Sequence, residues 1–82
     1  MSYEDNKKYL EELGYQYEGQ DKDVFFNKQT KLAFSREYIN DNNRDRALID
    51  AMIKKHSNHA SNLTKGIYLC ICNDRIEPID MS

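Results

Sequence analysis

The segment 66–72, with the sequence GIYLCIC, restricts the fold of this chain more than any other segment. Six of its seven residues are apolar, and no polar residue interrupts them after the glycine. A short apolar run without polar alternation is typical of a strand that is buried on both faces of a sheet. We therefore expect residues 66–72 to form a central strand, with the rest of the chain built around it.

The size and composition of the chain predict one small folded domain. The chain has 82 residues, of which 39% are hydrophobic, 32% are charged and 11% are aromatic. Such a chain is polar, but its apolar residues recur with the periods of helices and strands, which a disordered chain lacks. We expect a single domain over residues 1–82. A core this small favours extra stabilisation by a dimer, a metal or a bound partner.

The segments that precede the apolar run predict two helices and three short strands. We expect Ser2 to cap a helix that ends near Leu13, because Gly14 is a natural helix stop. Residues 15–18 alternate between tyrosine and polar residues, and residues 24–26 and 31–34 are largely apolar. Polar turns separate the three segments, which is typical of an antiparallel meander. A helical turn at 36–39 and a helix at about 44–55 follow, and residues 57–65 form a polar connection.

The predicted fold is α+β. An N-terminal helix is followed by a three-stranded antiparallel meander, a second helix and the final buried strand, which completes a four-stranded sheet. Both helices should cover one face of that sheet. The tail, residues 73–82, contains the chain's one proline, Pro78. We expect the tail to be an edge segment or to fray.

The sequence indicates a cytoplasmic protein that does not enter a membrane. The N-terminus has no apolar stretch of the kind found in signal peptides. No apolar run approaches the roughly 20 residues that a membrane-spanning helix needs. The two cysteines are two positions apart, a spacing that makes a poor disulfide. We expect both thiols to be reduced.

Both histidines and both cysteines fall within residues 56–72, in the pattern H-x-x-H followed by C-x-C. Histidine and cysteine are the usual ligands of tetrahedral zinc. Zinc sites more often use two cysteines separated by two to four residues, and cysteine is commonly buried without any function. We favour buried thiols and no cofactor, and a zinc-stabilised domain stays an alternative. Its ligands would be His56, His59, Cys70 and Cys72.

The sequence offers no set of residues that would act together in catalysis. The cysteines lie in the most apolar run, whereas a nucleophilic cysteine needs an exposed, electropositive setting. The three glycines form no phosphate-binding loop, and the carboxylates fall on a predicted helix surface and in turns. We therefore expect a protein that is not an enzyme.

Charge is unevenly distributed along the chain. Residues 24–66 carry four acidic and eight basic side chains, although the whole chain has a net charge of −2. This basic segment supports an alternative function as a nucleic-acid-binding module. A pI of about 5.6 argues against a dedicated binder of that kind. The candidate phosphate contacts are Lys28, Lys31, Arg36, Arg44, Arg46, Lys54 and Lys55.

The N-terminal segment is acidic and rich in tyrosine. Residues 1–23 carry seven acidic and three basic side chains. Tyrosine provides large contact area at low entropic cost, so this combination favours protein recognition. The candidate contact residues are Tyr3, Glu4, Tyr9, Glu11, Glu12, Tyr15 and Tyr17. Equally, these tyrosines could pack inward while the acidic residues only keep the chain soluble.

The function that we favour from the sequence is a protein-binding domain that acts as a regulator, inhibitor or adaptor of a larger protein. A phage-type inhibitor of a nucleic-acid enzyme would suit its size and its acidic N-terminal segment. The partner would be another protein, and the chain itself would be a monomer or a homodimer.

Overall fold

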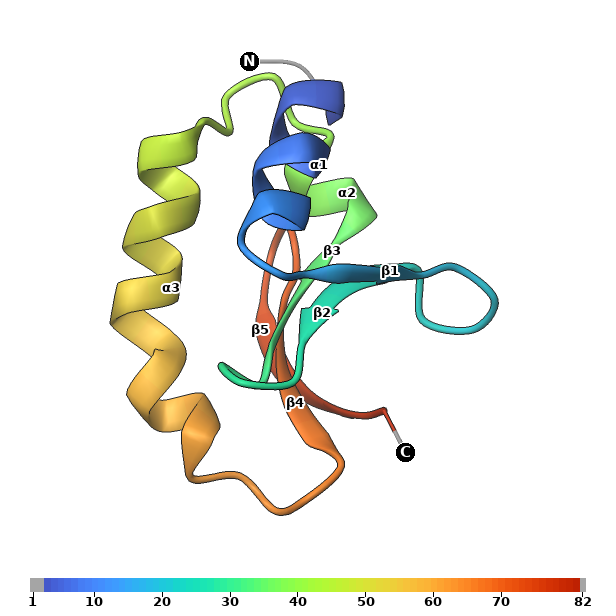
Figure 1. Cartoon of the computed structure of the whole chain (residues 1–82), viewed down its shortest axis with the longest axis vertical. Helices are drawn as coiled ribbons and strands as arrows, with labels where there is room; N and C mark the ends of the chain where they lie inside the picture. Colours follow the sequence, from blue (N-terminus) through green and yellow to red (C-terminus); the bar gives the residue numbers. More distant parts are fainter. Residues whose placement is uncertain (1–2, 82) are drawn as a thin grey trace.

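The computed structural model describes residues 3–81 (Figure 1). Ser2, the expected cap of the first helix, lies outside the described residues. Helices and strands follow one another as α1 (Tyr3–Glu12), β1 (Gln16–Glu18), β2 (Val24–Asn27), β3 (Leu32–Ser35), α2 (Arg36–Ile39), α3 (Arg46–Ser61), β4 (Ile67–Ile71) and β5 (Ile76–Asp80).

The strands form one mixed sheet in the order β1-β2-β3-β4-β5. Strands β1, β2 and β3 pair antiparallel, as the expected meander requires. Strand β4 pairs parallel to β3, because helix α3 crosses from one end of the sheet to the other between them. The α+β class is therefore confirmed. Strand β4 lies between β3 and β5, and Tyr68 through Ile71 are buried, as expected of a central strand.

The expectation of a four-stranded sheet is wrong, because the tail supplies a fifth strand. Strand β5 runs antiparallel to β4, and Ile67 is opposite Asp80. Proline lacks the N–H group that a central strand needs, but an edge strand has one side without a partner. Pro78 is therefore compatible with a strand at this edge of the sheet.

Helix α3 is longer at its C-terminal end than the sequence predicted. It begins after Asp45, whose carboxylate accepts a hydrogen bond from the Leu48 N–H. It continues to Ser61, six residues beyond the expected end. Ala60 is fully buried, so this last part of the helix packs on the core and is stabilised by tertiary contacts that its polar sequence does not reveal.

The buried side chains form two clusters, one on each face of the sheet. All three helices contribute to the larger cluster, in which Leu10, Ile39 and Ile49 pack against side chains from the sheet such as Phe25 and Phe34. The expected coverage of one face by helices is thus observed, with α2 as a third helix. The smaller cluster contains no helical residue.

No helix within residues 3–81 combines the length and the apolar character that crossing a bilayer requires.

Candidate functional site

Among residues 3–81, all three helices pack on one face of the sheet and none covers the other face. We call it the open face and define it by the side chains of the smaller cluster. These side chains lie on one face because residues directly opposite in paired strands point the same way. Phe26 is opposite Ala33, and Ala33 is opposite Cys70. The open face comprises Val24, Phe26, Ala33, Tyr68, Cys70, Cys72, Ile79 and Met81.

The open face is apolar at its centre and only partly shielded by its own side chains. Ala33 is fully buried, and the rings of Phe26 and Tyr68 meet edge to face at 5.9 Å. Phe26, Cys72, Ile79 and Met81 are partly exposed. Further burial of partly exposed apolar side chains lowers the free energy, so an uncovered sheet face that carries them is a candidate binding surface.

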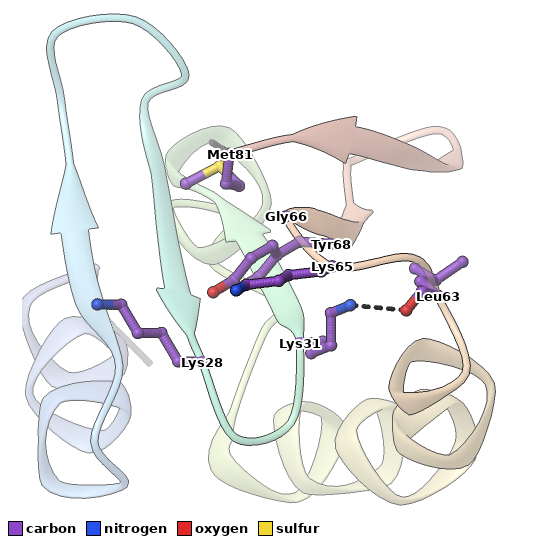
Figure 2. Close-up of a pocket in the computed structure, with 7 residues that line it drawn as sticks. All are labelled: Lys28, Lys31, Leu63, Lys65, Gly66, Tyr68 and Met81. Carbon is purple, nitrogen blue, oxygen red and sulfur yellow. Dashed lines mark hydrogen bonds between the residues drawn. The ribbon is translucent and has the colours of Figure 1, made fainter.

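A basic hollow of about 750 Å³ lies at one end of the open face (Figure 2). Its charged groups come from two separate segments, the turn between β2 and β3 and the connection from α3 to β4. Its apolar wall is formed by Tyr68 and Met81 of the open face and by Leu63 of that connection. We call it the lysine hollow, and it is lined by Lys28, Lys31, Leu63, Lys65, Gly66, Tyr68 and Met81.

The three lysines of this hollow do not have the same role. The Lys31 ammonium donates hydrogen bonds to the carbonyl oxygens of Leu63 and Thr64, at 2.8 and 2.7 Å. Figure 2 shows the Lys31 side chain directed at Leu63. Lys28 and Lys65 are exposed and form no ion pair with any residue in the range 3–81. Lys31 therefore connects the two segments that form the hollow, and Lys28 and Lys65 provide positive charge that is available to a partner.

The turn between β2 and β3 holds two of these lysines in place. The Asn27 side-chain oxygen accepts hydrogen bonds from the N–H groups of Gln29 and Thr30, which closes the turn. Lys31 has a φ of +59°, in the left-handed region, and its N–H donates to the Asn27 carbonyl oxygen. This backbone conformation is unusual for lysine, so the surrounding structure must hold it in place.

A second, acidic hollow of about 320 Å³ lies at the other end of the open face. The open-face residues Val24, Cys70, Cys72 and Ile79 contribute to its wall. Its charged groups are four acidic and two basic residues, so its formal charge is −2. We call it the acidic hollow, after its charged residues Asp21, Lys22, Glu37, Asp74, Arg75 and Glu77.

The two hollows lie at opposite ends of β4. Tyr68, near the start of this strand, lines the lysine hollow, and Cys72, directly after its end, lines the acidic hollow. Four residues of extended chain separate them by about 13 Å. This distance exceeds the screening length of about 8 Å at physiological salt, so the two ends present distinct charges to a partner.

The two thiols lie side by side on the open face, with their Sγ atoms 3.4 Å apart. Burial, followed by the hydrogen bond with Cys72, raises the pKa of Cys70 to about 12. The Cys70 thiol therefore stays neutral at physiological pH. A neutral, buried thiol is a poor nucleophile.

The structure does not bring the candidate zinc ligands together. His56 and His59 lie on α3, which packs on the helical face, whereas Cys70 and Cys72 lie on the open face. The sheet separates the two pairs. Among residues 3–81, no three His, Cys, Asp or Glu side chains are grouped as a metal site would require.

The N-terminal tyrosines are mostly directed inward. Tyr15 is 4% exposed, and its hydroxyl is 3.1 Å from the Thr30 hydroxyl. Tyr9 donates a hydrogen bond to the Asp50 carboxylate, and Tyr3 packs against a core phenylalanine. Tyr17 is 46% exposed and donates to a nearby aspartate. The candidate acidic residues Glu4, Glu11 and Glu12 are exposed on α1.

Besides Lys31, the candidate nucleic-acid contacts Arg36, Arg44 and Arg46 already have partners within the chain. The Arg36 Nε donates to both oxygens of Asp23. Arg44 and Arg46 each place the guanidinium over a tyrosine ring, at 4.2 and 5.0 Å. Lys54 and Lys55 are exposed on α3 and do not line the lysine hollow. Of the seven candidates, only Lys28 and Lys31 come together at this hollow.

Sequence reasoning missed Lys65 as a site residue. It belongs to the polar connection before the apolar strand, where a single lysine carries no special signal. Its place in the same hollow as Lys28 depends on the parallel pairing of β3 with β4, which the four-stranded prediction did not specify. Scans against protein-family models, curated proteins and solved structures found no match to this chain.

Proposed function

We propose that this chain is a non-enzymatic protein-binding domain whose lysine hollow receives a segment of another protein. The segment would combine carboxylates with at least one apolar side chain. The observation that carries the proposal is that Lys28 and Lys65, both without an ion-pair partner among residues 3–81, line one hollow beside the apolar wall of an uncovered sheet face.

The chemistry of the hollow favours a protein segment over a nucleic acid. Two free ammonium groups can pair with carboxylates, while Leu63 and Met81 offer apolar surface to a side chain between them. A strand of nucleic acid would need exposed aromatic rings for stacking. Tyr68 is only 8% exposed, and its ring already packs against Phe26. Binding without catalysis is also consistent with a role as regulator, inhibitor or adaptor.

The test uses a fluorescein-labelled peptide in which glutamates alternate with leucine and phenylalanine. Its binding to the chain is measured by fluorescence anisotropy. We expect binding that weakens as salt rises, because screening acts on exposed charges. The double variant Lys28→Glu/Lys65→Glu should bind about ten- to a hundredfold more weakly. This range follows from several exposed charge contacts of about 0.2–1 kcal/mol each being lost or reversed.

The matched control is Lys54→Glu/Lys55→Glu, which makes the same change in net charge on α3, away from the hollow. It should bind the peptide as tightly as the unmodified chain. Equal weakening by both double variants would contradict the proposal, because only net charge would then matter. Tight binding of a labelled single-stranded oligonucleotide, with no binding of the peptide, would also overturn it and favour the nucleic-acid alternative.

A further inference from the structure

We infer that a second copy of this chain binds to the open face and forms a two-fold symmetric dimer. This inference rests on the proposed function, because it names an occupant for the same lysine hollow. The observation behind it is that one face carries a basic hollow at one end, an acidic hollow at the other and apolar side chains between them.

Such a face is complementary to itself. Consider a two-fold axis that lies between two facing sheets and crosses their strands at right angles. Rotation about this axis reverses the direction of the strands, so the lysine hollow of each copy faces the acidic hollow of the other. Both contacts form at once, as in any isologous interface.

The charged side chains of the two hollows are available for such contacts. Lys28 and Lys65 are exposed and form no ion pair among the described residues. The side chains of Asp21 and Asp74 are 81% and 80% exposed. Among the described residues, each of these two aspartates forms its ion pair with the basic residue next to it in the chain, at the surface. Exposed pairs of this kind are weak and can rearrange when a partner arrives.

The centre of the face would supply the apolar part of the interface. Phe26, Cys72 and Ile79 are partly exposed on this face and would be buried against apolar side chains of the second copy's open face. Apolar residues at the centre with charged residues at the rim are the usual arrangement of a protein interface.

The size of the face predicts a weak, reversible dimer. The four strands that contribute to the open face span about 19 Å, and the longest of them, with five residues, are about 17 Å long, so the footprint is at most about 320 Å² in projection. Stable dimers usually bury about 800 Å² per partner. We therefore expect dissociation in the micromolar range or weaker.

The experiment is sedimentation velocity on the full chain over a concentration series from about 10 to 1000 µM. The unmodified chain should shift from monomer to dimer over this range. The basic-end variant Lys28→Glu/Lys65→Glu and the acidic-end variant Asp21→Lys/Asp74→Lys should each need at least tenfold higher concentration to associate. Both variants change exposed residues only, and their melting curves would show that they remain folded.

An equimolar mixture of the two variants provides the decisive measurement. One variant has a face that is acidic at both ends, and the other has a face that is basic at both ends. We expect the mixture to form a heterodimer at concentrations where each variant alone is monomeric. The control variant Lys54→Glu/Lys55→Glu should dimerise like the unmodified chain.

Two results would overturn the inference. If the unmodified chain and the mixture both stay monomeric throughout the range, a second copy does not occupy the open face. If a dimer forms but neither variant weakens it, another surface is responsible. Either result leaves the proposed function standing when the acidic peptide still binds, and loss of peptide binding alone would refute only that function.

Discussion

Substitution of Lys31 by methionine should destabilise the fold, although Lys31 is partly exposed. Its ammonium donates hydrogen bonds of 2.8 and 2.7 Å to the carbonyl oxygens of Leu63 and Thr64. These bonds join the turn before β3 to the connection that leads from α3 into β4. Methionine keeps the unbranched stem and takes the same left-handed backbone, so the substitution removes mainly these two bonds.

The expected loss can be worked out from the exposure of the two bonds. A hydrogen bond to a charged group contributes about 1.5–3 kcal/mol when it is well shielded. Here the bond to Leu63 is partly buried and the bond to Thr64 is exposed. Water can replace the ammonium at both carbonyl oxygens. We therefore expect the free energy of unfolding to fall by about 2 kcal/mol in total, rather than by the full sum.

The assay is thermal denaturation followed by circular dichroism. A domain of this size loses about 4–8 °C in Tm for each kcal/mol, so Lys31→Met should melt about 8–16 °C lower. Lys28→Met is the control, because Lys28 lines the same hollow without these bonds, and its stability should change by less than about 0.5 kcal/mol. Equal melting of the two variants would refute the division of the lysines into one structural and two free residues.

Three further outcomes follow from the structure. Phe34→Ala should lower the free energy of unfolding by about 3–5 kcal/mol in urea denaturation, because the ring is fully buried and truncation leaves a cavity; a loss below about 1 kcal/mol would contradict the packing. Hydrogen bonds from the backbone N–H groups of Lys22 and Gln20 lower the pKa of Glu18 below its ordinary value of 4.5. This local stabilisation is complete above pH 4.5 and is lost as the pH falls through the lowered pKa. As the pH falls through the lowered pKa, the amide hydrogens of Lys22 and Gln20 should exchange faster than in the Glu18→Gln variant. Exchange in that variant should show no transition at this pH. Iodoacetamide at pH 8 should alkylate Cys72 before Cys70, because Cys70 is buried and its pKa is raised to about 12; peptide mass spectrometry showing the reverse order would contradict this.

Local patterns were sufficient to predict the fold class and its central strand. The apolar run of residues 66–72 indicated burial on both faces, and Tyr68 through Ile71 are buried on either side of β4. The short strands of the meander were found because polar turns separate them. These features depend on neighbours in the sequence, which is why the sequence alone was sufficient.

Long-range contacts account for what the sequence did not predict. Residues 73–82 were expected to be an edge segment or to fray because they contain Pro78, and pairing with β4 makes residues 76–80 a full edge strand. The end of α3 looked like a polar connection, and the burial of Ala60 against the core extends the helix. The lysine hollow depends on the same kind of contact, because parallel pairing of β3 and β4 brings together lysines that are far apart in the chain.

The most direct test of the binding surface is a titration of the ¹⁵N-labelled chain with the acidic peptide, followed by two-dimensional NMR. The account predicts that the amide signals of Lys28, Lys65, Gly66 and Met81 shift in proportion to the peptide bound, while those of α1 stay in place. Shifts confined to α1, around Glu11 and Glu12, would contradict it and would place protein recognition on the acidic N-terminal surface instead.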